Sequence, residues 1–521
     1  MMKSPRIQNI LLILLAIAVC WALVCTRTAG VIPVWSTLRR LSPYLLAFAA
    51  CHTYFSSGDE KAWKVLFVLF CCYALAECGL GTAQLAGWTR SRHEHYQLTG
   101  NFINPAPYAC LLGVAAICCL VRLLRRDCGK ALKILSATTL VWSLAMVVIA
   151  QSRAVWLGTV LAAIVALARE SNNWARIRHK KLLVCCGVLL FLAGCFGVWM
   201  IKPESAQARL YIWQIDCLAI EDHPLMGAGP GTEMGAYGDA QSDYFKRHVR
   251  SWERQQAADI PDKPFNEFLR MGMACGIPGL LLAIAIFAIS LTIEIRERRL
   301  LAYPLIVLGT FALFSFPLCQ LALSMILTVT LADAVIAGKY GTKHPPIYYT
   351  LAVMVMSVSI PFCKEESDHR SELKGCIKTV KAQTLDSKEL AAYFEHLGDE
   401  PEYLKYYAKS LYDESRYDEA LAVVRRLERM TADPAVPIIR GEICRMTGDA
   451  PGAAEALIKS YYSAPSRLTA LFFLMTLYQS YGLNREAAAT REYALSLPVD
   501  EKYTATMEMR QQIEDYPLTT Q

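Results

Sequence analysis

The chain has 521 residues, of which 54% are apolar and only 19% are charged, and its mean hydropathy is positive. This composition is too apolar for a soluble enzyme of that length, so we expect a protein that lies at least partly in a membrane. Its formal net charge is +7, and no nucleic acid partner is expected.

Eleven apolar runs approach the roughly 20 residues that a helix needs to cross about 30 Å of hydrocarbon. They lie near 10–25, 41–55, 64–84, 104–122, 133–150, 153–168, 182–201, 266–293, 300–317, 321–337 and 347–363. Two of them are short, which makes ten to twelve spans the expected range. The first run has no small-residue cleavage pattern after it, which favours a retained helix over a signal peptide. The sequence predicts an all-α polytopic membrane domain over 1–363.

The distribution of Lys and Arg predicts the orientation of this domain, because short cytoplasmic loops carry an excess of both. With the N-terminus inside, the inner segments hold far more Lys and Arg than the outer short loops. An odd number of spans then leaves the C-terminus outside. Most of the 19 cysteines lie within the apolar runs and none forms a CxxC pair, so neither a zinc site nor a disulfide framework is expected.

The first polar stretch on the predicted outer face, 97–109, contains Asn101 and Asn104 followed by Pro105. These residues suit the start of a helix, with Asn as the cap and Pro in the first turn. In the next polar stretch Arg153 stands between two apolar runs, where an Arg without a partner costs about 2.5–3.5 kcal/mol. An anionic ligand explains this position better than a snorkelling anchor does.

A glycine-rich turn, GAGPGT at 227–232, follows a predicted helix at about 205–221 within a large outer loop, 202–265. The turn has no Lys, its glycines do not follow the GxGxxG spacing, and Pro230 removes a backbone N–H group, so a nucleotide loop is excluded. A sharp turn that ends the helix is predicted instead. Arg209 and Trp213 share one face of that helix.

The tail, 364–521, has helical periodicity and repeats. Ala420, Ala454 and Ala488 stand 34 residues apart, the period of a tetratricopeptide repeat, at positions where antiparallel helices would cross. Tyr417 and Pro498 fit that repeat, but its first-helix Trp and Gly are missing, and an unrelated helical bundle is the alternative. Stacked repeats form concave surfaces that bind partners, so a protein partner is expected here.

The polar stretches together resemble the motifs of the O-antigen ligase and polymerase superfamily, many-span glycosyltransferases of the bacterial inner membrane. The resemblance rests on G-N-F-x-N-P at 100–105, S-R-x-x-W-L at 152–157, R-x-x-x-W and D-H-P-x-x-G-x-G-x-G at 209–231, N-E-x-L at 266–269 and G-I-P-G-L at 276–280. It covers about half of the chain, and some relatives also carry C-terminal helical repeats.

This resemblance implies transfer of a glycan from an undecaprenyl-diphosphate carrier to an acceptor hydroxyl at the periplasmic face, without a cofactor or an essential metal. The chain would span the bacterial inner membrane in contact with its lipids, with a cytoplasmic N-terminus and a periplasmic tail. The acceptor would be a lipid-linked glycan or a protein, because the motifs do not separate a ligase from a polymerase or a protein O-oligosaccharyltransferase.

Arg153 and Arg209 are the candidates to bind the diphosphate, since a guanidinium holds phosphate oxygens bidentately and stabilises charge on a leaving group. Further candidate substrate contacts are Asn101, Asn104, Lys202, Trp213 and Asn266. Ligases of the superfamily usually carry a His before the Asn of N-E-x-L, but this chain has Phe265 there.

The departure at Phe265 leaves the general base open. His223 and Glu267 are the candidates, with His248 in the same loop, unless the good leaving group makes a base unnecessary. Both candidates also have structural interpretations, His223 as a cation at a helix C-terminus and Glu267 as a carboxylate at a helix N-terminus.

Two functions from other classes stay open. A transporter would place charges near the bilayer midplane, and Glu77 and Asp333 are the charged residues that fit this pattern. A membrane-tethered repeat scaffold would make the tail the working part.

Overall fold

The computed structural model describes residues 4–56, 60–125, 129–170, 203–248, 261, 263–337, 346–382, 386–498 and 504–518. All regular secondary structure within these ranges is helical, which confirms the predicted all-α polytopic membrane protein. The predicted span at 182–201 and the candidate Lys202 lie outside the described residues.

The membrane part begins with six helices, α1 (Ser4–Ala29), α2 (Val34–Ser56), α3 (Glu60–Leu85), α4 (Pro105–Arg125), α5 (Lys130–Ile149) and α6 (Arg153–Glu170). It continues with α11 (Glu267–Arg296), α12 (Ala302–Ala312), the 3-10 helix η2 (Pro317–Cys319), α13 (Leu321–Ile336) and α14 (Pro346–Ala382). Five of the described helices, α1, α3, α4, α5 and α11, are long and apolar enough to cross a membrane. Outside 182–201, each predicted run coincides with a helix at least in part.

Two predictions about this part need correction. The run at 300–317 is helical mainly in α12, whose 11 residues rise only about 16 Å, too little for about 30 Å of hydrocarbon. The predicted domain boundary at 363 falls inside α14, which continues for 19 residues beyond it to Ala382.

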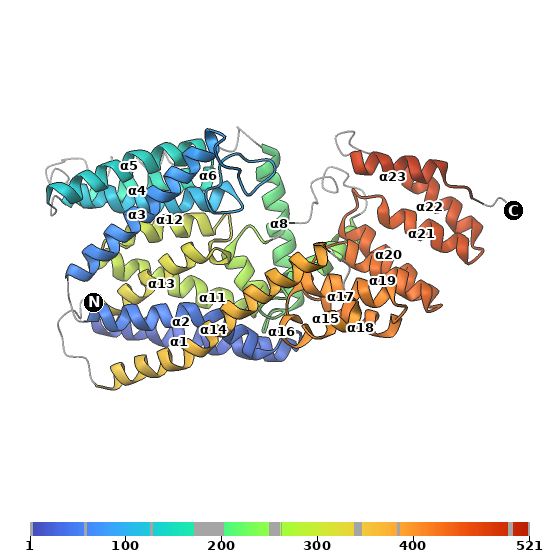
Figure 1. Cartoon of the computed structure of the whole chain (residues 1–521), viewed down its shortest axis with the longest axis horizontal. Helices are drawn as coiled ribbons and strands as arrows, with labels where there is room; N and C mark the ends of the chain where they lie inside the picture. Colours follow the sequence, from blue (N-terminus) through green and yellow to red (C-terminus); the bar gives the residue numbers. More distant parts are fainter. Residues whose placement is uncertain are drawn as a thin grey trace.

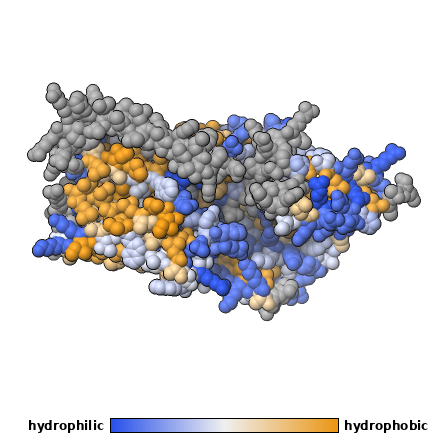
Figure 2. All heavy atoms as spheres, turned by 90° about the horizontal axis from the view of Figure 1, so that it is seen from above, coloured by the Kyte–Doolittle hydropathy of each residue, from blue (hydrophilic) through white to orange (hydrophobic). Residues whose placement is uncertain are grey.

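The core of the membrane part forms around α4, which is apolar on nearly all sides and buried by its neighbours. Its Cys110, Cys118 and Cys119 are buried, as expected of Cys acting as a small hydrophobe. The outer surface is also apolar, with Ile134 and Val141 more than 60% exposed on α5. Figure 2 shows this surface in orange, whereas the C-terminal part of the molecule is mostly hydrophilic.

Two helices of the large loop separate the membrane part from the tail. Helix α8 (Pro203–Asp222) runs across the ends of the membrane helices, and α9 (Glu233–Arg247) follows it on the side of the tail (Figure 1). Helix α8 packs against both α9 and α11, whereas α9 packs against a tail helix, α20. The loop thus connects the two parts of the molecule.

The tail begins with the short helices α15 (Ser387–Ala391) and α16 (Phe394–Leu397). Successive antiparallel helices follow, α17 (Pro401–Asp413), α18 (Tyr417–Glu428), α19 (Ala435–Met446), α20 (Ala450–Ser463), α21 (Thr469–Ser480), α22 (Asn484–Ser496) and α23 (Thr504–Asp515). Ala420 is fully buried as predicted, but of the adjacent alanines in the next two repeats Ala453 and Ala487 are fully buried, not Ala454 and Ala488. The predicted register was therefore wrong by one residue at Ala454 and Ala488, because alanine neighbours alanine at both positions.

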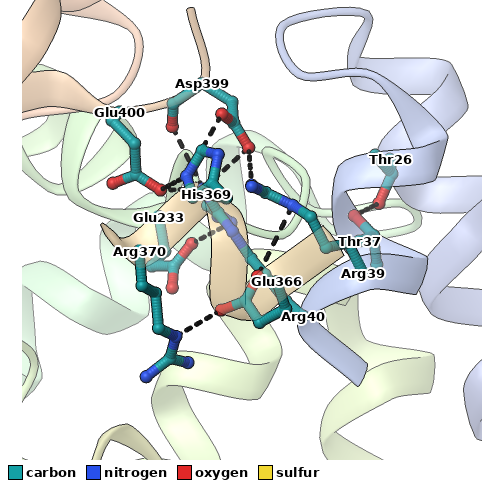
Figure 3. A network of polar contacts seen from close by, with 11 residues as sticks. Thr26, Thr37, Arg39, Arg40, Glu233, Glu366, His369, Arg370, Asp399 and Glu400 are labelled. Atoms are coloured by element: carbon teal, nitrogen blue, oxygen red, sulfur yellow. Dashed lines mark hydrogen bonds and ion pairs between the residues drawn. The ribbon is translucent and has the colours of Figure 1, made fainter. Parts of the chain in front are cut away.

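A group of charged side chains, which we call the anchor network, joins the tail to the membrane part (Figure 3). It consists of Arg39 and Arg40 of α2, Glu366 and His369 of α14, and Asp399 and Glu400 before α17. Arg39 Nη2 lies 2.8 Å from Asp399 Oδ2, and Arg40 Nη2 lies 3.1 Å from Glu400 Oε1. Arg39 is completely buried, so the tail is fixed by charges that the fold removes from water.

Candidate functional site

The structure places the two predicted phosphate ligands, Arg153 and Arg209, near each other. Arg153 is the first residue of α6, and Arg209 lies in the N-terminal half of α8. Burial, and after it the positive charge of Arg153, lowers the pKa of Arg209. No acidic partner of Arg209 occurs within the described ranges. Two guanidinium groups from distant parts of the sequence therefore lie close enough for their charges to interact.

An aromatic surface supports this site. The guanidinium carbon of Arg209 lies 5.7 Å from the ring centroid of Phe265, a cation–π distance. Trp213, one turn after Arg209, donates from Nε1 to the Phe265 carbonyl at 3.3 Å, and its ring lies 5.8 Å from that of Phe314. Phe265, the residue in place of the usual His, thus packs against the candidate phosphate ligand. The predicted face of Arg209 and Trp213 exists, but only the folded chain reveals that Phe265 adjoins it.

The side chains of Asn266 and Glu267 in the N-E-x-L motif accept hydrogen bonds from backbone N–H groups. Asn266 caps α11, and its Oδ1 accepts from the N–H groups of Phe268 at 3.0 Å and Leu269 at 3.2 Å. Glu267 is buried, bridges to Arg270 at 2.5 Å, and accepts from the Leu318 N–H group at 3.1 Å. Both Glu267 oxygens are engaged, which favours its structural interpretation over that of a general base.

The two glycine motifs form one junction. The Ala228 N–H group donates to the Met273 carbonyl at 2.8 Å, and the Ile277 N–H group donates to the Pro224 carbonyl at 2.8 Å. These contacts hold the turn after α8 against a kink of α11 at Gly276, whose φ is +70°. The predicted sharp turn is present, and Gly276 is its counterpart on α11, which the sequence pattern did not indicate.

Comparison with known families agrees with this geometry. Residues 138–284 match the family described as O-antigen ligase. This match supports the O-antigen ligase superfamily for the segment 138–284. The matched segment, the O-antigen ligase domain, contains both arginines, Phe265 and the glycine junction, and it makes the protein a glycosyltransferase-type membrane enzyme. No curated protein matches the chain.

One predicted catalytic residue lies far from the others. His223 follows α8 directly, 14 residues after Arg209, which places it about 20 Å away along the helix axis. A general base must come within hydrogen-bond reach of the proton it removes, or act through one water. His223 and Arg209 therefore lie far apart along α8, and a role of His223 as the general base stays a prediction.

The asparagines before the O-antigen ligase domain also have structural partners. Asn104 Oδ1 accepts from the Ala106 N–H group at 2.9 Å and starts α4 as predicted. Asn101 donates from Nδ2 to Glu77 Oε1 at 2.8 Å, and its N–H group donates to Glu77 Oε2 at 3.1 Å. Glu77, 1% exposed, thereby holds the loop between α3 and α4. A single carboxylate near the end of an apolar run was the only sequence signal for this role.

A cluster in the tail has the residue types of a metal site. Each of His369, Asp399 and Glu400 offers one possible ligand atom, and these three atoms lie within 4.8 Å of one another. Arg39 and Arg40, however, already donate to Asp399, and Arg40 also donates to Glu400. Because two guanidinium groups repel a cation at these oxygens, we assign the cluster to the anchor network and not to a metal.

Proposed function

We propose that the protein transfers a glycan from an undecaprenyl-diphosphate carrier to an acceptor hydroxyl at the periplasmic face of the bacterial inner membrane, as an O-antigen ligase does. The observation that carries the proposal is the meeting of Arg153 and Arg209. A diphosphate is the leaving group that this reaction requires, and it would occupy a site with fixed positive charge.

The electrostatics of the two arginines favour an anion. Like charges that lie close together raise each other's free energy, and partial burial of Arg209 adds a desolvation cost. A bound diphosphate would offset both costs with bidentate hydrogen bonds. Charge grows on the diphosphate as its bond to the sugar breaks, so the same contacts would strengthen in the transition state and lower the barrier.

The proposed reaction does not need a strong base. The acceptor oxygen forms a bond to the anomeric carbon while the bond between that carbon and the diphosphate oxygen breaks. The acceptor proton passes to solvent or to the departing diphosphate. This scheme agrees with the engaged oxygens of Glu267 and the distant position of His223.

The charges that a transporter would need already have structural partners. Glu77 binds the loop after α3, and Asp333 pairs with Arg299 at 2.6 Å. Transfer is therefore the better supported function, and the donor step is the same for a ligase, a polymerase or a protein O-oligosaccharyltransferase.

The test is reconstitution of the purified chain in liposomes with an undecaprenyl-diphosphate-linked glycan and candidate lipid-linked or protein acceptors. We expect Arg153→Ala and Arg209→Ala each to lower turnover about 100-fold or more. Arg90→Ala is the matched control, because Arg90 is an exposed arginine of the loop after α3, and it should keep wild-type turnover. Full turnover in both arginine variants would contradict the proposal.

The scaffold alternative is separated by a second comparison. If the tail were the working part, deletion of 364–521 would abolish function in cells while Arg209→Ala would leave it intact. Our proposal requires that Arg209→Ala abolishes glycan transfer in cells even though the protein reaches the membrane in normal amount.

A further inference from the structure

A pocket of about 520 Å³ lies at the C-terminal end of α8, away from the two arginines. The turn after α8, the end of α1, helix α9 and Arg429 of the tail all contribute to its walls. Its size falls within the range of about 300–1,000 Å³ that is usual for small-molecule sites. The polar side chains that line it are those of Thr28, Asp222, His223, Thr232, Asp239 and Arg429.

Some of these polar groups are held in place by the protein. Asp239 forms a 2.6 Å ion pair with Lys459 of α20, and Arg429 donates to the Ala29 carbonyl at 2.8 Å. Asp222 and His223 are exposed, and neither side chain forms a hydrogen bond or ion pair with the part of the chain that the structure describes. The pocket therefore combines two side chains that the protein holds in place, Asp239 and Arg429, with two that are accessible to a ligand, Asp222 and His223.

The chemistry of the lining favours an uncharged ligand rich in hydroxyl groups. The carboxylate of Asp222 accepts hydrogen bonds, the guanidinium of Arg429 donates them, and the imidazole of His223 can do either. The negative charges of Asp222 and Asp239 are matched by Arg429 and the neighbouring Lys459, so no excess positive charge selects a phosphate. Leu225, which is 70% exposed, adds an apolar wall for the C–H face of a sugar ring.

A second, smaller hollow of about 200 Å³ continues along α8. It shares Asp222 with the first and is also lined by Gln214, Tyr244 and His248. The rings of Tyr244 and His248 stack with their centroids 4.5 Å apart. The carboxylate and amide of α8 thus face the aromatic side chains at the end of α9, an arrangement that fits a chain of sugar residues better than a single small molecule.

We propose that the pocket at Asp222 and His223 is a glycan-binding subsite, which holds sugar residues several positions away from the bond that reacts. The inference rests on the proposed function, because it takes the ligand to be the glycan of a reactant. His223 would bind this glycan, not remove a proton at the arginines. Since Arg429 comes from the tail, the subsite also gives the tail a direct part in substrate binding. The glycan belongs either to the donor or to the acceptor.

Binding is measured directly on the full chain in detergent. The probes are the free oligosaccharides that mild acid releases from the undecaprenyl-linked donor and from a candidate lipid-linked glycan acceptor. We expect one of them to bind wild type, and Asp222→Asn together with His223→Ala to weaken its Kd about tenfold or more. Thr28→Trp, which fills the pocket from an exposed position, should weaken it similarly. Glu221→Gln is the matched control because Glu221 is an exposed neighbour that lines neither hollow.

Kinetics then identify the source of the glycan. The pocket variants should raise the KM of the donor or of the acceptor while kcat changes little, and the reactant whose KM rises is the one bound. The inference is overturned if neither oligosaccharide binds wild type, or if the variants keep the wild-type Kd and both KM values. Failure of the proposed function looks different, because wild type would then transfer no glycan even if an oligosaccharide bound and the variants released it.

Discussion

Asp216 is a fully buried carboxyl group of α8. Neither of its oxygens has a hydrogen-bond partner among the described residues. Burial raises the pKa of Asp216 well above its usual range. Burial, followed by the charges of Tyr211 and Asp216, likewise raises the pKa of Tyr237. The helix that carries Arg209 therefore packs through a carboxyl group whose protonated form is favoured by burial.

This protonation predicts a pH dependence of stability. The folded state keeps the Asp216 proton that the unfolded chain loses above its pKa of about 3.9, so the contribution of Asp216 is largest below pH 4 and falls as pH rises toward the raised pKa. We expect Asp216→Asn, which cannot ionise, to raise the melting temperature relative to wild type by a few degrees more at pH 8 than at pH 5. Thermal unfolding in detergent at the two pH values measures this, and an equal difference at both would contradict it.

The glycine junction shows how two elements position the site. Gly227 has a φ of +67°, and a Cβ atom there would lie 2.5 Å from the backbone of Ala274 and Cys275. Gly276 has a φ of +70°, and its added Cβ would lie 2.3 Å from the Leu225 carbonyl oxygen. Each glycine therefore permits both a left-handed backbone and a close approach. Together they fix the end of α8 on α11.

Gly227→Ala separates these two requirements when it is compared with Gly30→Ala. Gly30 also has a positive φ, +64°, but no atom lies within 4 Å of its added Cβ. We expect Gly30→Ala to lose about 1 kcal/mol of stability through backbone strain, and Gly227→Ala to lose at least twice as much and to reduce glycan transfer. Chemical denaturation and the transfer assay measure both. Equal losses would show that the close approach is unimportant.

The anchor network sets the position of the tail in the whole molecule. Arg39 lies 2.8 Å from Asp399 and 3.4 Å from Glu366, and all three side chains are buried. Arg40 extends from the same network toward the glycine turn, where its Nη1 would lie 3.1 Å from a Cβ added at Gly231. Arg40 thus links the Asp399–Glu400 segment of the tail to the turn that ends the Arg209 helix, so the placement of the tail and that of the turn depend on a shared residue.

Removing Arg39 tests this connection. Arg39→Ala leaves the buried carboxylates of Asp399 and Glu366 without their buried cation. We expect this substitution to lower the free energy of unfolding by about 3–5 kcal/mol and to expose the α14–α17 region to protease. Arg370→Ala is the control, since the Arg370 side chain pairs with the same Glu366 at 2.6 Å but is 53% exposed. This substitution should lower the free energy of unfolding by only about 0–1 kcal/mol. Similar proteolysis of both variants would show that the tail is held by other contacts.

The sequence determined the elements. Three sequence signals predicted helices: the apolar runs, the proline after Asn104 and the repeat period of the tail. They succeed because helix formation depends on neighbouring residues and on the burial of apolar surface. The motifs also predicted the superfamily and the two arginines. The repeat register was uncertain by one residue because adjacent alanines at 453 and 454, and at 487 and 488, have equal volume and polarity.

The tertiary structure decided which side chains act together. The charges of Arg153 and Arg209 interact, Phe265 lies beside Arg209, and His223 lies about 20 Å from Arg209 along the axis of α8. Order along the chain cannot specify these relations, because residues in different helices are brought together by packing and residues in one helix are kept apart by its rise. The sequence thus predicted a membrane glycosyltransferase with two candidate arginines, and the packing of α8 against α11 brings Arg209 beside Phe265.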